Sequence, residues 1–240
     1  MKGKIYLIPS TLGDSSIERV IPADIANIVK SIRFFIVENE RTSRRFLKKL
    51  STDIIIDELN FQILNKHTKA DEISAFIKPA NKGNDIGVIS EAGCPGVADP
   101  GADIAAIGHI NGIQVIPLVG PSSIILSLMA SGLNGQNFAF VGYLPIKPRE
   151  RSKAIKQLEA RSKKENQTQI FIETPYRNNQ LIDDIIKYCE APTLLCIACD
   201  ITLDTEFIST KTITSWNKTK PNINKRPCIF LLHSPLFQKR

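Results

Sequence analysis

The chain has 240 residues, of which 42% are hydrophobic and 23% charged, and its 31 Lys and Arg against 24 Asp and Glu give a net charge of +7. This composition is ordinary for a globular protein and allows one large core or two small ones. The positive charge favours a polyanionic partner such as RNA without requiring one. The first residues, MKGKIYLIPSTLGD, hold only a short apolar run before Pro9, so we expect neither a secretory signal nor a membrane span, and a cytoplasmic protein.

The first half of the chain alternates short apolar runs with helical patterns. Strands are expected at 4–9, 33–39, 85–90 and 113–120, and helices from about Pro22, over 41–50, from Pro100 and over 122–133. This alternation is typical of βαβ units and predicts a mostly parallel sheet. Gly112 and Gly132 occupy positions typical of helix C-caps.

The rhythm changes after residue 135. Strands are expected at 138–145, 167–174, 193–201 and 226–234, and helices over 149–164 and from Pro175. We therefore expect two domains, an N-terminal α/β domain with Pro/Gly loops over 1–135 and a C-terminal mixed α/β domain over 136–240.

The cysteines and histidines do not form a metal-ligand pattern. Cys196 and Cys199 form a CxxC, but they lie in an apolar strand, where positions three apart point to opposite faces, and no second CxxC or His pair accompanies them. We expect buried reduced thiols and no metal. The other cysteines are Cys94, Cys189 and Cys228. His67, His109 and His233 are expected to be surface or hydrogen-bonded residues.

Three loops that contain Pro or Gly follow strands of the first domain, at 9–14, 91–101 and 120–123. The middle loop lies between a short apolar strand and a helix that is expected to start with Asp99 as N-cap. It is therefore longer than most strand-to-helix loops, which have roughly two to six residues. Open α/β sheets bind ligands at this edge. No P-loop or GxGxxG occurs, so the loops favour a mixed polar and apolar ligand, although each alone is also explained as an ordinary turn.

Several motifs, taken in order, resemble the S-adenosylmethionine-dependent methyltransferases of the tetrapyrrole methylase superfamily, above all its small-subunit ribosomal RNA 2′-O-ribose methyltransferase I family. PSTLGD at 9–14 resembles the family's P-T-P-I-G-N, and ENERTS at 38–43 its E-D-T-R-x-T. SEAGCPGVADPG at 90–101 aligns without a gap with S-D-A-G-x-P-x-x-x-D-P-G, the most specific match. PLVGPSS, FVGYLPIKPRER and FIETPYR resemble later elements, so the resemblance covers about residues 4–233.

The chain departs from the family in two places. ACDITLDTE stands where the family carries A-R-E-L-T-K-x-x-E, so Cys199 and Leu203 replace an Arg and a Lys, while Thr202 and Glu206 remain. Arg226 and Pro227 replace a Gly-Glu before the last strand. These changes affect charges expected to face RNA or the reaction.

The resemblance implies a two-domain tetrapyrrole methylase-like fold with a parallel-sheet N-terminal domain and a mixed-sheet C-terminal domain. It also implies that S-adenosyl-L-methionine binds in a cleft between them, near Pro9, Gly93, Cys94, Val97, Ser122, Ser123 and Thr174. Methyl transfer is an in-line displacement that depends on orientation, and a base would assist a weakly acidic ribose hydroxyl. The candidates for that base are Glu38, Glu173 and Glu206, each of which could equally be a salt-bridge partner.

A basic helix provides a second reason to expect RNA. Helical spacing places five cations along one face, with Phe46, Leu47 and Leu50 toward the core. These cations are Arg41, Arg44, Arg45, Lys48 and Lys49, to which the later segment adds Lys147, Arg149, Arg151 and Lys153. They could follow a phosphate backbone, although an ordinary solvated helix face explains them equally well. Aromatic residues for base stacking are sparse, so RNA shape and backbone would dominate.

We therefore expect a methyltransferase that acts on ribosomal RNA or the small ribosomal subunit, as a homodimer by family resemblance. Two alternatives stay open. The acceptor could be a tetrapyrrole or a protein side chain, or the chain could be a non-catalytic S-adenosylmethionine-binding homologue that has lost the Arg and Lys at Cys199 and Leu203.

Overall fold

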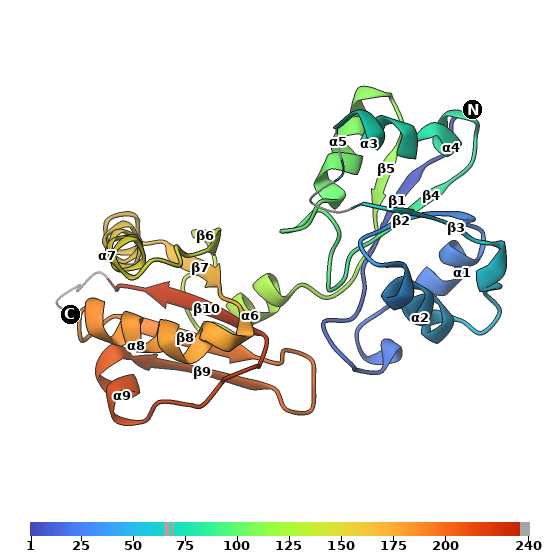
Figure 1. Cartoon of the computed structure of the whole chain (residues 1–240). Helices are drawn as coiled ribbons and strands as arrows, with labels where there is room; N and C mark the ends of the chain where they lie inside the picture. The colour runs from blue at the N-terminus through green and yellow to red at the C-terminus, as the bar shows by residue number, and fades with distance from the viewer. Residues whose placement is uncertain (65–67, 69, 236–240) are drawn as a thin grey trace. The chain divides into compact units, whose positions relative to one another are not determined.

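The computed structural model of the chain describes residues 1–64, 68 and 70–235. The chain forms two compact units, Met1–Ser122 and Ser123–Arg240, each with its own sheet (Figure 1). This division lies before the boundary expected near residue 135. The reason is that α6 (Ser123–Ser131) packs against two strands of the second unit, β9 (Phe207–Thr212) and β10 (Cys228–His233).

The first unit is built on a five-stranded parallel sheet of order β3-β2-β4-β1-β5. Its strands are β1 (Ile5–Ile8), β2 (Phe34–Val37), β3 (Asn60–Ile63), β4 (Ile86–Ile89) and β5 (Val115–Pro117). Its α-helices are α1 (Asp24–Lys30), α2 (Glu40–Leu50), α3 (Ala70–Phe76), α4 (Lys78–Asn81) and α5 (Gly101–Ile110). Two 3-10 turns, η1 (Ile17–Arg19) and η2 (Ile56–Glu58), complete the described elements. The parallel pairing confirms the prediction from alternating strands and helices.

Alternate residues of the central strands enter different core layers. In β2, Phe35 and Val37 pack with residues of α1 and α2, whereas Ile36 packs with Ile104 of α5 and other residues on the opposite face. All four residues of β4 are buried, as is typical of parallel strands covered on both faces. The covered faces leave the carboxyl ends of the strands as the place for a ligand site.

The second unit holds a mixed sheet of order β6-β7-β10-β8-β9. β6 (Phe138–Tyr143) runs parallel to β7 (Thr168–Ile172), while β10 is antiparallel to β7 and to β8 (Leu194–Cys199), which is antiparallel to β9. Its remaining helices are α7 (Pro148–Glu165), the 3-10 turn η3 (Pro175–Arg177), α8 (Asn178–Tyr188) and α9 (Ile213–Lys218). The mixed sheet expected after residue 135 is confirmed.

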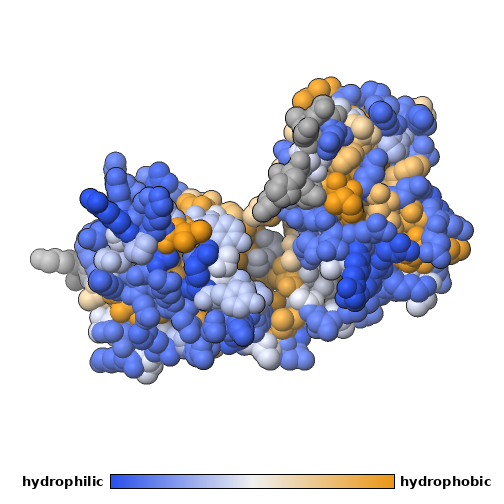
Figure 2. Space-filling view, in the orientation of Figure 1, coloured by the Kyte–Doolittle hydropathy of each residue, from blue (hydrophilic) through white to orange (hydrophobic). Residues whose placement is uncertain are grey.

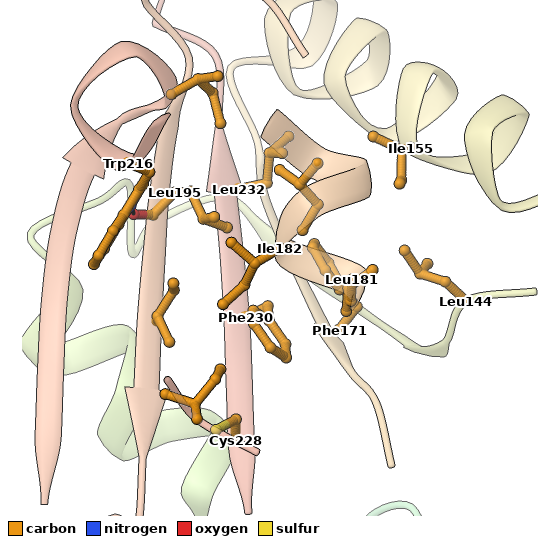
Figure 3. Packing of buried hydrophobic residues seen from close by; sticks show 14 of the residues in the cluster. Leu144, Ile155, Phe171, Leu181, Ile182, Leu195, Trp216, Cys228, Phe230 and Leu232 are labelled. Atoms are coloured by element: carbon orange, nitrogen blue, oxygen red, sulfur yellow. Dashed lines mark hydrogen bonds between the residues drawn. The ribbon is translucent and has the colours of Figure 1, made fainter. Parts of the chain in front are cut away.

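The core of the second unit lies between this sheet and the helices α7, α8 and α9 (Figure 3). The rings of Phe171 and Phe230 stack with centroids 5.8 Å apart. Trp216 is fully buried, and its indole Nε1 donates a hydrogen bond of 2.8 Å to the carbonyl oxygen of Leu195. A buried indole with its donor satisfied adds packing area without an unpaired polar group.

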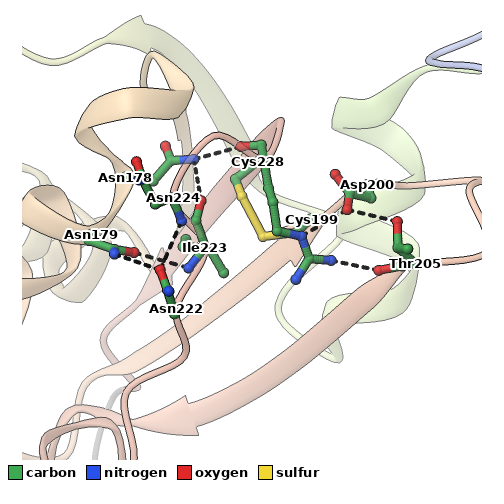
Figure 4. Close-up of a disulfide and its surroundings, with 10 residues drawn as sticks. Asn178, Asn179, Cys199, Asp200, Thr205, Asn222, Ile223, Asn224 and Cys228 are labelled. Carbon is green, nitrogen blue, oxygen red and sulfur yellow. Dashed lines mark hydrogen bonds and ion pairs between the residues drawn. A yellow bond between two sulfur atoms is a disulfide. The ribbon is translucent and has the colours of Figure 1, made fainter.

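One cysteine prediction is wrong. Cys199 forms a disulfide with Cys228 (Figure 4), because the antiparallel register of β8 and β10 places these residues directly opposite each other, with Cα atoms 4.2 Å apart. Cys196 points to the other face of β8 and keeps a buried free thiol, as expected. Cys94 and Cys189 are also free.

The surface of each unit is mainly polar on the face shown in Figure 2, where hydrophobic residues appear in separate groups. Within the described residues, no helix combines the length and the apolar character needed to cross a membrane.

His109 is exposed, and His233 is buried with the pKa of its imidazole lowered by burial. His67 lies outside the described residues.

Candidate active site at the carboxyl edge of the parallel sheet

The loops that follow β1 and β4 are bonded to each other. The backbone N–H of Ser10 donates to the carbonyl oxygen of Gly93 at 2.9 Å, which forms an isolated antiparallel bridge. The Ser10 hydroxyl donates to the carbonyl of Ser90, and the Ser90 hydroxyl donates to the carbonyl of Gly93, both at 3.0 Å. These bonds fix the start of the loop 90–101 against the loop 9–14.

The rest of the loop 90–101 is held by one carboxylate. Asp99 Oδ1 accepts hydrogen bonds from the N–H groups of Gly96 at 2.7 Å and Gly101 at 2.6 Å. Helix α5 begins at Gly101 with Pro100 as its N-cap, one position later than predicted, but Asp99 still caps its first turn through this bond. Gly93 and Gly96 have φ values of +76° and +82°, which explains why glycine occupies these positions.

The loop that follows β5 closes the same site. A Cβ built on Gly93 would lie 3.1 Å from the carbonyl oxygen of Pro121, and one built on Gly120 would lie 2.3 Å from Pro9. The Cys94 thiol lies 3.4 Å from the Pro121 carbonyl, and burial raises its pKa, so it is a packing group and not a nucleophile. The structure therefore brings together Pro9, Gly93 and Cys94 of the predicted cofactor residues.

The remaining predicted cofactor residues are distributed differently. Val97 lies in the same loop with 48% of its surface exposed. Ser122 ends the first unit, whereas Ser123 begins α6 in the second unit. Thr174 follows β7 and precedes η3 in the second unit. These residues stay predictions as cofactor contacts.

Three carboxylates surround this part of the first unit. Glu38, Glu91 and Asp99 line one open hollow beside Gly96, and the N–H of Glu91 donates to Glu38 Oε1 at 3.3 Å. Burial raises the pKa of Glu38, and the charges of Asp99 and Glu91 raise it further. Residues 90–101 contain no Lys or Arg. A negative, backbone-lined loop fits a sulfonium cation, which basic side chains would repel.

The other two candidate bases are engaged within the second unit. Glu173 accepts from Arg177 and from the N–H of Thr174, both at 2.6 Å. Burial alone would raise the pKa of Glu173, but these bonds hold it below its usual value. Glu206 Oε2 accepts from the N–H of Thr202 at 2.7 Å, where Thr202 has a positive φ of 75°. Both carboxylates therefore stabilise turns, one after β7 and one after β8.

Helix α2 presents part of the predicted basic stripe. The side chain of Asn39 caps it by accepting from the N–H groups of Arg41 at 2.9 Å and Thr42 at 3.3 Å. Phe46 and Leu47 are buried and Leu50 is half-buried, as the helical spacing predicted. Arg44 is paired with Glu40 and Asp57 at 2.9 and 3.0 Å, and Lys49 is paired with Asp14 at 2.6 Å.

The charges of the stripe are therefore not equivalent. Arg41, Arg45 and Lys48 are exposed and form no ion pair within the described part of the chain. Lys48 donates only to the carbonyl of Thr52. These three cations are the ones that α2 leaves available to a polyanion.

The second basic segment behaves differently from its prediction. Lys147 is exposed, with Glu150 at 3.4 Å. The side chain of Arg151 is 2% exposed, and its Nε donates to Asp184 at 2.7 Å while Nη1 donates to the carbonyl of Ile146 at 3.2 Å. Arg151 joins α7 to α8, and we therefore leave it out of the proposed RNA-binding surface.

A guanidinium lies in the region where the resembling family carries an Arg and a Lys. Arg226 Nε donates to Asp200 at 2.8 Å, and Nη2 donates to the carbonyl of Thr205 at 2.5 Å (Figure 4). Cys199, which stands where the family has Arg, is fully buried. The guanidinium of Arg226 comes from the segment that leads into β10, and it is paired with Asp200 directly after β8.

Sequence reasoning missed the hydroxyl bonds of Ser10 and Ser90 and the bond from the Thr42 hydroxyl to Glu91 at 2.6 Å. These bonds join residues far apart in the chain, so no local pattern indicates them. The cap formed by Asn39 could have been found from the sequence, because Asn directly before a helical pattern is a standard N-cap signal.

No group of three His, Cys, Asp or Glu that could hold a metal occurs within residues 1–64, 68 and 70–235.

Comparison with known proteins places the chain in a family. No protein-family model matches the chain. Ribosomal RNA small subunit methyltransferase I of Buchnera aphidicola subsp. Schizaphis graminum (strain Sg) is 30% identical over 233 residues, which cover 96% of this chain and 78% of that protein. The protein of the same name from Escherichia coli O157:H7 is 24% identical over 234 residues, with the same coverage of each chain.

Two solved structures share the fold. The methyltransferase CobJ matches with a TM-score of 0.64 and 15% identity, over 97% of this chain and 94% of that chain. The uroporphyrin-III-C-methyltransferase from Thermus thermophilus matches with a TM-score of 0.57 and 14% identity over the same shares. They confirm the two-domain tetrapyrrole methylase-like fold, while the sequence relation over nearly the whole chain shows that the protein belongs to the ribosomal RNA small subunit methyltransferase I family.

Proposed function

We propose that the protein uses S-adenosyl-L-methionine to methylate a ribose 2′-oxygen of small-subunit ribosomal RNA. The observation that carries the proposal is the loop 90–101, which aligns with the family signature and is closed against Ser10 by the bridge to Gly93. The names of the relatives support ribosomal RNA as the substrate. The unpaired cations of α2 support a polyanionic substrate.

The loop geometry supports the choice of methyl donor. When bound, S-adenosyl-L-methionine supplies a methyl group on a positively charged sulfur. Gly93 and Gly96 leave the backbone open to close approach, because neither carries a side chain. Glu38, Glu91 and Asp99 contribute negative charge beside Gly96, which stabilises a nearby cation.

Glu38 is the candidate base that the geometry favours. Its carboxylate lies at the end of β2, is half-buried, and has a pKa raised by burial and by two neighbouring carboxylates. A base with a raised pKa accepts a proton from a hydroxyl more readily near neutral pH. Glu173 and Glu206 are already bonded to turns of the second unit, so we assign them positioning roles.

The assembly is part of the same proposal. We infer a cytoplasmic homodimer, which the family resemblance supports. Sedimentation velocity of the full chain at micromolar concentration is expected to give the mass of two copies, and a monomer at all concentrations would contradict the dimer.

Methylation of isolated RNA tests the function directly. Small-subunit ribosomal RNA from cells lacking the protein should accept a labelled methyl group from S-adenosyl-L-methionine, and nucleoside mass spectrometry should identify one 2′-O-methylated nucleotide. Glu38→Gln serves as the low-activity control. An unchanged ribose-methylation profile in the deletion strain, together with no transfer in vitro, would reject the RNA substrate and favour a tetrapyrrole, a protein side chain or a non-catalytic role.

A further inference from the structure

A cavity of about 230 Å³ lies within the first unit, between the loop after β1, helix α2 and the end of β4. It is a separate feature from the open hollow at Gly96, although Glu91 lines both. Pockets for drug-sized ligands are about 300–1,000 Å³. The cavity therefore has room for a smaller group, such as one sugar-phosphate unit.

The cavity has an apolar side and a polar side. Ile17, Phe46 and Ile89, all buried in the core, form the apolar side. Hydroxyl groups and two cations form the polar side. A ribose has the same division, since its C–H groups and its hydroxyls occupy different parts of its surface.

Three polar groups on the wall have no partner within the described part of the chain. The Ser43 hydroxyl belongs to a residue that is 3% exposed, yet it makes no hydrogen bond with a described residue, and neither does the hydroxyl of Thr11. The guanidinium of Arg45 forms no ion pair or hydrogen bond with a described residue. Ser43 is buried, Thr11 is half-buried and Arg45 is exposed. All three groups are therefore free to donate hydrogen bonds to a polar ligand in the cavity.

The other charged groups on the wall are already engaged. Lys49 is paired with Asp14 at 2.6 Å, and the carboxylate of Glu91 accepts from the Thr42 hydroxyl at 2.6 Å. Arg45 is therefore the cation that remains free to meet an anion. A guanidinium offers a fork of donors that matches two phosphate oxygens.

We propose that this cavity holds the ribose phosphate of one nucleotide of the RNA substrate, with Arg45 binding the phosphate and the hydroxyls of Ser43 and Thr11 donating to its oxygens. The inference rests on the proposed function and adds to it a binding site for one nucleotide of the RNA strand, which we call the nucleotide seat. Ser90 and Glu91 line the cavity and begin the loop proposed to hold the methyl donor. A nucleotide in this seat would therefore lie beside the reaction site.

A titration of the full chain with small ligands tests the seat. Ribose 5-phosphate and uridine 5′-monophosphate should shift the amide resonances of residues 10–13 and 42–46, and uridine, which lacks the phosphate, should bind at least about tenfold more weakly. Arg45→Gln should weaken the phosphate-bearing ligands at least about tenfold, as expected for loss of a charge-assisted bond. Lys82→Gln is the matched control, because Lys82 is exposed before β4, at the opposite end of that strand from the cavity.

Three results would overturn the seat. The first is an equal loss of affinity in Arg45→Gln and Lys82→Gln. The second is displacement of the nucleotide by S-adenosylhomocysteine, which would assign the cavity to the donor. The third is binding of inorganic phosphate with the same affinity as ribose 5-phosphate, which would show an anion site that does not recognise the sugar.

Methylation measurements separate this inference from the proposed function. If the protein methylates ribosomal RNA and Arg45→Gln leaves KM unchanged, the seat is wrong and the function stands. If it methylates no RNA but binds uridine 5′-monophosphate through Arg45, the function fails and the nucleotide seat is retained. A KM for RNA raised at least tenfold by Arg45→Gln, with unchanged affinity for S-adenosylhomocysteine, supports both.

Discussion

Gly93 shows how a single residue determines the geometry of the loop 90–101. Its φ of +76° belongs to a region that side chains rarely adopt, and a Cβ there would approach Leu12 and the carbonyl of Pro121 to 3.1 Å. Its own carbonyl receives the N–H of Ser10. Any side chain at this position changes both the backbone conformation and the space beside it.

Replacing Gly93 by Ala should weaken binding of S-adenosylhomocysteine at least about tenfold. Gly112→Ala is the control, because Gly112 also has a positive φ, of 59°, but a Cβ there meets nothing within 4 Å. Both variants should lose roughly 1–2 kcal/mol of stability from the strained backbone, whereas only Gly93→Ala should lose affinity in isothermal titration. Equal affinity in the two variants would place the donor elsewhere.

The raised pKa of Glu38 predicts the pH dependence of methyl transfer. The proposed base, Glu38, must be ionised to accept a proton, and burial with neighbouring carboxylates raises its pKa above the ordinary 4.5. Activity should therefore fall as the pH drops through this raised value. Glu38→Gln should lower kcat by about 10²–10⁴-fold and abolish this acid limb.

The pH profile of kcat provides the measurement, with Glu206→Gln as the comparison. If Glu206 only holds the N–H of Thr202, that variant should keep the acid limb at the wild-type position. An acid limb that persists in Glu38→Gln and disappears in Glu206→Gln would move the base to Glu206.

At the level of elements, the strands β3 and β9 were not predicted, and both lie at the edge of a sheet. The edge strands β5 and β6 were predicted because their sequences, VIP and FAFVGY, are mainly apolar. Every residue of β9 is half-buried, and its sequence FISTKT is mostly polar. An edge strand that buries little surface carries a weak hydrophobic signal. Helices α3, α4 and α9 have seven, four and six residues, too few to show a clear helical period. Helix α1 also has seven residues, but Pro22 just before its N-cap indicated its start.

The candidate site was predictable to the extent that it depends on local motifs. The family signature located Gly93 and Cys94, and the N-cap pattern located Asp99. Local motifs did not distinguish free cations from paired ones. Arg151 and Asp184, for example, lie 33 positions apart and meet only when α7 packs on α8. The same limit hid the disulfide, since the register of β8 and β10 is a tertiary property.

The pair of Arg151 and Asp184 should make a large contribution to the packing of α7 on α8. Arg151→Met removes a buried cation and leaves Asp184, which is 20% exposed, without its partner. We expect a loss of about 3 kcal/mol, the lower end of the range for breaking a buried pair, because Asp184 retains some contact with water. Urea unfolding monitored by the fluorescence of Trp216, the single tryptophan, reports on this unit.

Lys163→Met is the matched control for that measurement. Lys163 lies on the same helix and pairs with Glu190 at 3.2 Å, but both side chains are about half exposed. Exposed pairs contribute roughly 0–1 kcal/mol. A loss in Arg151→Met no larger than in Lys163→Met would show that Arg151 is not structural and would return it to the RNA-binding candidates.

At the level of the whole molecule, the net charge of +7 does not specify where a polyanion binds. Ion pairs neutralise Arg44 and Lys49 on α2 and Arg151 on α7. The cations that remain exposed and unpaired among the described residues include Arg41, Arg45 and Lys48 on α2 and Arg149 and Lys153 on α7. Those of α2 lie in the same unit as the loop 90–101.

The unpaired cations of α2 predict how RNA binding depends on salt. Each cation that neutralises a phosphate releases counterions, so the logarithm of affinity falls with the logarithm of salt by roughly 0.7 per contact for single strands. The double variant Arg41→Gln, Lys48→Gln should therefore reduce the slope by roughly 1.4. Fluorescence anisotropy with small-subunit ribosomal RNA from low to moderate salt measures this slope, and affinity for S-adenosylhomocysteine should not change.

Lys82→Gln distinguishes local contacts from net charge in this experiment. It removes one positive charge from the same unit, at the opposite end of β4 from the loop 90–101. If α2 contacts the phosphates, the slope of Lys82→Gln should equal that of the wild type, because a charge that meets no phosphate releases no counterions. A slope that falls in proportion to the number of charges removed, regardless of position, would show non-specific attraction and contradict an RNA-binding role for α2.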